Sequence, residues 1–203
     1  MASTVYGVAR RPASCSGCGV NLDAFRPQPE LTGPNVILRQ LDGSHLDDVL
    51  KTVRDPEVRR LTGTHARFTE PLLARWLESR PEQDGRADWA VTHREDGRFL
   101  GDLALNDIDA DNESAAFRIA LAPGAVGRGY GTEATRLVLE FAFETVGLHR
   151  VSLEVYDFNS RARRAYEKCG FVAEGVLRDA LCWEGKRHHA VVMSVLAPQW
   201  RLR

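Results

Sequence analysis

The chain has 203 residues, of which 43% are hydrophobic, and this length fits a single domain that folds without a metal or a disulfide framework. Its 27 basic and 28 acidic residues leave a net charge of -1, which argues against non-specific binding to nucleic acid or to a membrane. We expect neither partner. Because no apolar run approaches the ~20 residues of a membrane span and the start lacks a secretory pattern, we expect a cytoplasmic location.

The first thirty residues are rich in Ser, Gly, Pro and Arg and show no sustained hydrophobic period. This composition predicts a flexible N-terminal extension over residues 1–30 and a folded domain over residues 31–200. Cys15 and Cys18, followed by Gly19, resemble half of a zinc knuckle, but no second Cys or His pair at ligand spacing accompanies them. Metal binding by this pair stays open beside an unstructured tail, and we predict no metal ligand in the domain.

The first half of the domain predicts a strand, three short helices and an antiparallel meander. Val36 and Leu38 alternate with polar residues as in a strand, and Ser44 is a suitable N-cap for a short helix over residues 45–50. Two more short helices begin near Asp55 and Thr69, each with Pro in its first turn. Alternating apolar residues predict strands over residues 89–91, 99–105 and 115–121, with turns at residues 95–97 and 109–112.

The second half alternates helix and strand. The strongest helix of the sequence carries apolar residues at helical spacing from Ala134 onward and ends at Gly147. A strand over residues 151–155, a helix from Asn159 to Gly170 and closing strands over residues 171–176 and 190–196 follow. Together these elements predict a single-domain α/β fold with a mixed, mostly antiparallel sheet flanked by helices. We expect the ligand-binding crevice where the antiparallel part of the sheet meets the parallel part.

Glycines alternate in Gly127-Arg128-Gly129-Tyr130-Gly131-Thr132, between a strand and the start of the strongest helix. Unsatisfied backbone N–H groups and the helix dipole make such a position an anion site, and glycines let the backbone approach a diphosphate closely. A tight turn without a ligand explains the same glycines. A dinucleotide fingerprint, Gly-x-Gly-x-x-Gly, is the third interpretation: it fails at Thr132, although Asp157 could pass for its ribose-binding acid.

A second group of residues makes the interpretation more specific. The stretch from Asn159 to Phe171 resembles the pattern of the GNAT N-acetyltransferases, in which Asn caps a helix, Tyr lies on its last turns and Gly-Phe leads into a strand. With the glycines at the right separation, the resemblance covers residues 31–200. The stretches over residues 31–39 and 183–196 also resemble the opening and closing strands of the ribosomal-protein N-acetyltransferase branch of this superfamily.

The resemblance implies a GNAT fold, acetyl-CoA as co-substrate and direct transfer of the acetyl group to a primary amine. Backbone N–H groups would bind the pyrophosphate, Asn159 would contact the pantetheine arm, and Tyr166 would face the thioester sulfur. A bulged strand around Ile119 to Leu121 would supply the N–H group for the oxyanion. The predicted catalytic residue is Tyr166, and the predicted cofactor-binding residues are Ile119, Leu121, Val126, Gly127, Arg128, Gly129, Tyr130, Gly131, Thr132, Asn159 and Arg163.

Tyr166 suits the role of a general acid. Residues seven apart on a helix return to the same face, so Asn159 and Tyr166 can line one groove with Arg163 nearby. A phenol with a pKa of ~10 can protonate a thiolate whose acid has a pKa near ~8.5, although the transfer is not strongly downhill. Simple packing of the Tyr166 ring in the core is the alternative.

Two positions depart from the family pattern. Val126 stands where relatives usually carry Arg or Gln, so phosphate binding would rest on the backbone and the helix dipole. Ala116 stands where relatives that act on ribosomal proteins often have Glu, so the expected general base is missing. Glu113 and Glu154 are candidate substitutes, and each is also explained as a surface carboxylate.

The missing base leaves two interpretations of the function. One is an N-acetyltransferase whose acceptor is a small molecule or a protein N-terminus bearing an amine. The other is a non-catalytic acyl-CoA-binding or sensor module. Without a strong base, an α-amine of pKa ~7.8, roughly one-seventh neutral at pH 7, should be a better acceptor than a lysine-like amine of pKa ~10.4. The identity of the acceptor and the formation of a homodimer stay open.

Overall fold

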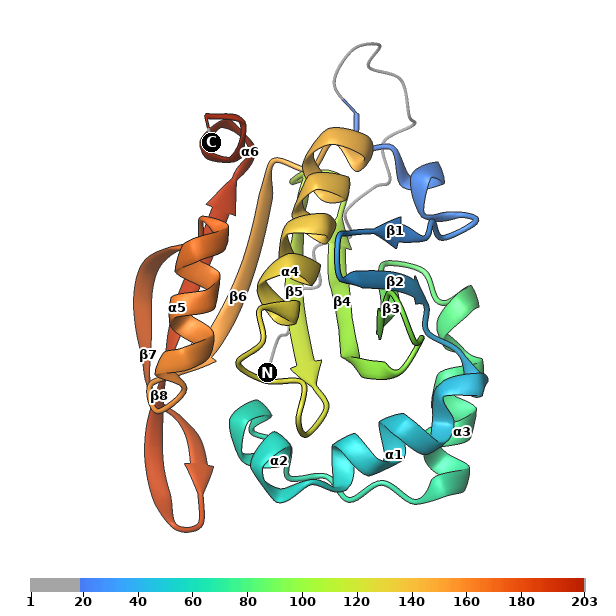
Figure 1. Cartoon of the computed structure of the whole chain (residues 1–203). Helices are drawn as coiled ribbons and strands as arrows, with labels where there is room; N and C mark the ends of the chain where they lie inside the picture. The colour runs from blue at the N-terminus through green and yellow to red at the C-terminus, as the bar shows by residue number, and fades with distance from the viewer. Residues whose placement is uncertain (1–18, 203) are drawn as a thin grey trace, which may run out of the picture.

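Eight strands form one mixed sheet in the computed structural model, which describes residues 19–202 (Figure 1). Their order is β1-β2-β3-β4-β5-β6-β8-β7, and all neighbours are antiparallel except β5 and β6. The predicted α/β fold with a mixed, mostly antiparallel sheet is confirmed. The strands are β1 (Leu31–Thr32), β2 (Val36–Gln40), β3 (Ala87–His93), β4 (Phe99–Asp109), β5 (Ser114–Leu121), β6 (Arg150–Tyr156), β7 (Val172–Trp183) and β8 (Lys186–Leu196).

Helices cover both faces of the sheet. Side chains alternate along β3, so Trp89 and Val91 enter a core with α4, η4 and α5, whereas Ala90 enters a smaller core with α1 and α3. These two sides are called the α4/α5 face and the α1–α3 face. The helices are η1 (Leu22–Phe25), η2 (Gly43–His45), α1 (Leu46–Arg54), α2 (Pro56–Thr62), α3 (Glu70–Glu78), η3 (Arg80–Glu82), α4 (Tyr130–Glu140), η4 (Phe141–Val146), α5 (Ser160–Cys169) and α6 (Ala197–Arg201).

The segment before β1 packs on the domain from residue 19 onward. The Phe25 ring is buried and packs edge-on against the Phe141 ring, with 5.4 Å between the ring centroids. The Trp89 indole N–H donates to the Pro29 carbonyl at 3.0 Å. Residues 19–30 therefore differ from the flexible extension expected for residues 1–30. The sequence pattern could not indicate this, because single contacts of this kind have no period. Residues 1–18, with Cys15 and Cys18, lie outside the described residues.

β5 and β6 are paired only where both strands begin. The parallel pairing joins Ser114 to Arg150 and ends where Ala116 meets Ser152. Beyond that point the two strands diverge, as Figure 1 shows at the lower end of the sheet. We call the divergence between residues 117–121 of β5 and residues 153–156 of β6 the β5–β6 split. It is the place where the antiparallel and parallel parts of the sheet meet.

Glu174 links the last three strands of the sheet. Its carboxylate accepts two hydrogen bonds from the Arg150 guanidinium of β6, at 2.7 and 2.5 Å, and one from the Ser194 hydroxyl of β8, at 2.6 Å. These donors, Arg150 first, lower the pKa of Glu174 from the usual 4.5 to about 2. Ionised Glu174 therefore stabilises the fold above pH 4.5, and this contribution is lost as the pH falls toward about 2.

We expect Glu174→Gln to lower the free energy of unfolding at pH 7 by about 1 kcal/mol, a small value because the side chain is 40% exposed. The difference in the free energy of unfolding between wild type and variant should narrow as the pH falls from 4.5 toward about 2. Urea unfolding of both proteins across this pH range measures that difference. An equal loss at every pH would show that the Glu174 charge does not act in this way.

Candidate functional site

The glycine loop connects the end of β5 to the start of α4. Gly127 and Gly129 have φ angles of 82° and 87°, a left-handed conformation that glycine adopts without strain. Gly129 is the N-cap of α4, and no side chain caps the helix there. The first N–H groups of α4 are therefore not satisfied by a capping side chain, as an anion site requires.

The three glycines of the loop have two different reasons to be glycine. A Cβ added at Gly127 or Gly129 would meet nothing within 4 Å, so both positions face open space and are constrained by φ. A Cβ at Gly131 would lie 3.1 Å from the Leu121 side chain and 3.8 Å from that of Ile119. Gly131 thus lets α4 pack closely on β5, and Ile119 and Leu121 direct their side chains at that helix.

Tyr130 directs its side chain away from the first turn of α4. Its ring meets the edge of the His93 ring at 5.6 Å, and its hydroxyl accepts a hydrogen bond from the Arg98 guanidinium at 3.3 Å. A depression of about 260 Å³ lies beside it, lined by Arg98, Phe99, Leu100, Pro123, Gly124, Ala125, Arg128 and Tyr130. The Tyr130 phenol is consequently engaged by His93 and Arg98.

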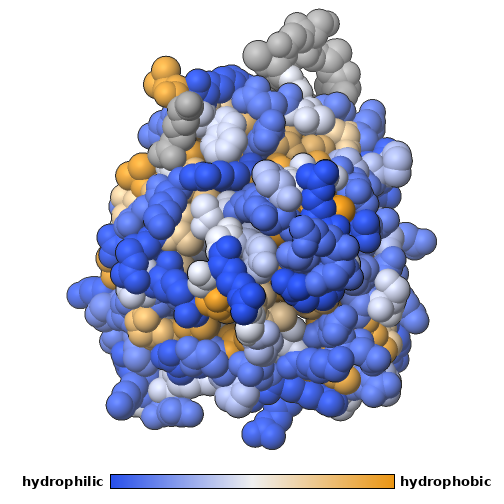
Figure 2. All heavy atoms as spheres, viewed as in Figure 1, coloured by the Kyte–Doolittle hydropathy of each residue, from blue (hydrophilic) through white to orange (hydrophobic). Residues whose placement is uncertain are grey.

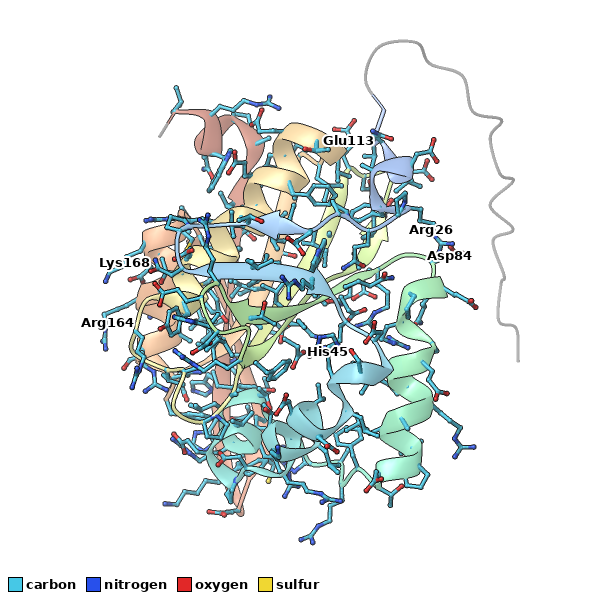
Figure 3. The ribbon with its side chains drawn as sticks, turned by 45° about the vertical axis from the view of Figure 1, so that its right-hand side comes forward. Arg26, His45, Asp84, Glu113, Arg164 and Lys168 are labelled. Atoms are coloured by element: carbon cyan, nitrogen blue, oxygen red, sulfur yellow. The ribbon has the colours of Figure 1, made fainter. Side chains whose placement is uncertain are left out.

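Helix α5 lies beside α4 and approaches its first turn. The Cys169 thiol at the end of α5 donates to the carbonyl of Thr132, at 3.5 Å. The outer surface of α5 is polar: Arg164 and Lys168 project away from the protein, and hydrophilic side chains cover most of this face (Figures 2 and 3). The start of α4 and the inner surface of α5 thus flank the β5–β6 split on the α4/α5 face.

Asn159 and Arg163 both have partners within α5. The Asn159 side-chain oxygen caps the helix by accepting the Ala162 N–H at 3.2 Å, which leaves its amide NH₂ as the group available to a ligand. The Arg163 guanidinium donates to the Glu167 carboxylate at 3.0 Å, and both side chains are about half exposed. Such an exposed pair is weak, so Arg163 can be drawn to a phosphate at little cost.

Tyr166 lies where β5 leaves β6. Its half-buried ring packs edge-on against Phe117 at 6.4 Å and Phe171 at 5.8 Å, and Phe117 is the first residue of β5 beyond the parallel pairing. Burial, and then the neighbouring Cys169, raise the pKa of the Tyr166 phenol. The phenol is therefore protonated at neutral pH. The packing alternative and the catalytic prediction are compatible, because the ring packs while the hydroxyl has no hydrogen bond to residues 19–202.

The expected bulge near Ile119 and Leu121 is not present. Leu103 pairs with Ile119, Asp102 with Ala120 and Gly101 with Leu121, so this part of the β4–β5 ladder runs in regular register. Every second N–H of β5 nevertheless points away from β4, and β6 pairs with β5 only up to Ala116. The departure of β6, rather than a bulge, leaves β5 backbone groups for an oxyanion.

The structure separates the two candidate bases. Glu113 precedes β5 at its far end, where its carbonyl accepts the N–H groups of His149 and Arg150, and Figure 3 shows it at the top of the molecule. At ~3.3 Å per residue, β5 places it more than about 20 Å from the glycine loop. Glu154 instead lies on β6 within the split, exposed, on the α1–α3 face opposite the buried Leu153 and Val155.

The sequence analysis missed a charge cluster on the same face, in which an exposed arginine lies against two buried carboxylates. The Arg118 guanidinium of β5 lies 3.0 Å from the Asp102 carboxylate of β4 and 3.6 Å from Asp88 of β3. Burial raises the pKa of Asp102 more than Arg118 lowers it. Only the register of three strands brings these residues together, so no spacing in the sequence indicates the cluster. Among residues 19–202, no group of three His, Cys, Asp or Glu side chains could hold a metal ion.

Residues 35–172 match the family model of the acetyltransferase (GNAT) domain, which is more than half of the chain. The chain belongs to the GNAT acetyltransferase family. It is similar to the SPbeta prophage-derived uncharacterized N-acetyltransferase YokL of Bacillus subtilis, with 25% identity over 84% of this chain and 95% of the relative. It also resembles the spermidine N(1)-acetyltransferase of Vibrio cholerae, with 31% identity over 50% of this chain and 59% of the relative.

Solved GNAT structures share the fold. A crystal structure of spermidine N-acetyltransferase from Vibrio cholerae, in complex with CoA and spermine, has a TM-score of 0.78 at 22% identity, over 83% of this chain and 99% of that one. A crystal structure described as a putative acetyltransferase has a TM-score of 0.71 at 30% identity, over 85% of this chain and 88% of that one. The predicted family and fold are confirmed, and this GNAT protein is an acetyl-CoA-dependent N-acetyltransferase.

The ribosomal-protein branch is represented among the GNAT relatives. The putative ribosomal N-acetyltransferase YdaF of Bacillus subtilis is 33% identical over 52% of this chain and 57% of the relative. Relatives of the ribosomal and the spermidine kind therefore match the same GNAT chain, and these matches do not select an acceptor. Within residues 19–202, no helix has the length and apolar character needed to cross a membrane.

Proposed function

We propose that this GNAT enzyme acetylates an α-amine in the β5–β6 split, with acetyl-CoA bound on the α4/α5 face. The supporting observation is the position of Tyr166, whose phenol has no hydrogen bond to residues 19–202 at the point where β5 and β6 part, close to the uncapped start of α4. Backbone N–H groups of residues 126–132 bind the pyrophosphate. The Asn159 amide contacts the pantetheine arm, and Arg163 adds a charge near the phosphates.

The reaction is a direct transfer. The neutral amine attacks the thioester carbonyl from the α1–α3 face, an unpaired β5 N–H stabilises the oxyanion, and the thiolate takes a proton from Tyr166. Burial raises the pKa of the Tyr166 phenol above its usual value, which makes it a weaker acid. Desolvation acts in the same direction on the leaving thiol, because burial disfavours its thiolate form as well.

Glu154 is the proposed acceptor of the proton that the amine loses. It is exposed, it lies within the split, and its charge contributes after burial to the raised pKa of Tyr156, its neighbour on the same face of β6. The carboxylate also attracts the protonated form of the amine. Since an α-amine is already partly neutral at pH 7, the assistance that Glu154 must provide is small.

We expect Glu154→Gln to lower kcat/KM for an α-amine by about tenfold at pH 7, and by less as the pH approaches the pKa of the amine. Steady-state rates from pH 6 to pH 9 measure the effect. Glu113→Gln is the matched control, because it removes the same charge at the far end of β5 and should leave the profile unchanged. A loss in the Glu113 variant, or none in the Glu154 variant, would contradict this assignment of the base.

Initial rates of coenzyme A release with a panel of amines test the function itself. The proposal predicts turnover with α-amines and a rate that exceeds the hydrolysis of acetyl-CoA in their absence. Binding of acetyl-CoA without turnover of any amine would instead favour the acyl-CoA sensor. The cytoplasmic location, the absence of nucleic-acid and membrane partners, and the homodimer stay predictions.

A further inference from the structure

Arg59 of α2 has a buried donor with no partner. Its Nε atom is buried and has no hydrogen bond to residues 19–202, and one Nη atom donates to the His65 carbonyl at 3.0 Å. Buried polar groups in folded proteins are nearly always hydrogen-bonded, most strictly when they are charged. The partly buried Arg59 guanidinium therefore keeps hydrogen-bonding capacity that residues 19–202 do not use.

The position of α2 relates this donor to the split. Gly63 lies four residues after Arg59, hence on the same side of the helix, and it packs against the Tyr156 side chain of β6. Helix α2 also contacts β5, and Figure 1 shows it below the lower end of the split. Helix α2 thus lies beside the α1–α3 side of the split, where Tyr156 and Glu154 share a face of β6, and Arg59 stands one helical turn before the residue that contacts Tyr156.

The next arginine shows that the unpaired donor is specific to Arg59. The Arg60 guanidinium donates two hydrogen bonds to Glu57, at 2.9 and 3.0 Å, and lies 4.9 Å above the Phe158 ring. Arg60, on the same helix, is therefore satisfied by the protein. Arg59 differs in having an N–H that nothing described in the protein accepts.

We infer that Arg59 recognises an oxygen atom next to the reactive amine of the acetyl acceptor, while Glu154 receives the amine; this rests on the proposed function. An α-amine flanked by a carboxylate or an amide carbonyl carries both groups at adjacent carbons. A polyamine has no such oxygen, and the positive charge of Arg59 would repel its additional ammonium group. The guanidinium also lowers the pKa of a nearby ammonium, which increases the neutral, nucleophilic fraction.

Arg59→Met tests the inference, because it removes the donors and keeps an unbranched apolar stem. With L-alanine and L-alaninamide as acceptors, kcat/KM should fall by about 10- to 100-fold, mainly through KM, whereas isopropylamine, which lacks the oxygen, should be unaffected. Arg59→Lys should restore part of the rate. Comparison of alanine with its amide separates recognition of a carboxylate from that of a peptide-like carbonyl.

Arg60→Met is the matched control and should leave the preference for oxygen-bearing acceptors intact. Arg59→Met should leave acetyl-CoA binding unchanged and should lower the thermal midpoint only slightly, since the single hydrogen bond it removes joins the guanidinium to the His65 carbonyl. An equal loss with isopropylamine, or a wild-type preference for spermidine over alanine and its amide, would overturn the inference while the acetyltransferase activity stood. Calorimetry of alaninamide with the enzyme–CoA complex gives a readout without turnover: no difference between wild type and Arg59→Met would also overturn it.

Discussion

Replacing Tyr166 with Phe is expected to lower kcat by about 10²-fold while leaving acetyl-CoA binding nearly unchanged. The variant loses only the hydroxyl, and the ring keeps its packing against Phe117 and Phe171. Because the hydroxyl makes no hydrogen bond to residues 19–202, its removal breaks no contact of the free protein there. A thermal midpoint and a dissociation constant close to those of the wild type should therefore accompany the loss of rate.

Single-turnover rates decide whether Tyr166 acts in the chemical step. If product release limits kcat in the wild type, the steady-state loss will be smaller than the loss measured in a single turnover. Equal single-turnover rates for wild type and Tyr166→Phe would mean that the phenol only packs. A large fall in stability would likewise place the hydroxyl in the structure rather than in the reaction.

Gly129→Val is expected to weaken acetyl-CoA binding by about 10²-fold, equivalent to about 2.7 kcal/mol. A Cβ at this N-cap position meets no protein atom within 4 Å, so it would enter the open space where the pyrophosphate is proposed to bind. The branched side chain would thus block the approach of the diphosphate to the first N–H groups of α4. Calorimetric titration with CoA measures the change.

The positive φ of Gly129 makes a matched control necessary. A valine there is strained whether or not a ligand binds, because φ is 87°. Gly85 has a φ of 73°, a Cβ added there also meets nothing within 4 Å, and it lies before β3, outside the glycine loop. We expect Gly129→Val and Gly85→Val to lose similar thermal stability, but only the first to lose CoA binding. Equal binding by both variants would show that the loop is only a turn.

The sequence alone determined the elements whose causes are local. Asn159 caps α5, Gly170 ends it in a left-handed conformation, and the glycines before α4 stand at a helix start, as their spacing predicts. Hydrophobic period and turn residues likewise predict the meander and the strand–helix alternation, which together specify the mixed sheet. These features depend on residues within a few positions of one another, so the sequence pattern predicts them.

Only the tertiary structure decided which side chains meet across the sheet. Strand register brings Arg118 to Asp102, and the divergence of β6 from β5, rather than a bulge, exposes backbone groups beside Tyr166. Two carboxylates that look alike in the sequence, Glu113 and Glu154, lie at opposite ends of the site's strands. Contacts of this kind join residues that are distant in the chain. Neither local conformational preference nor hydrophobic period indicates such contacts.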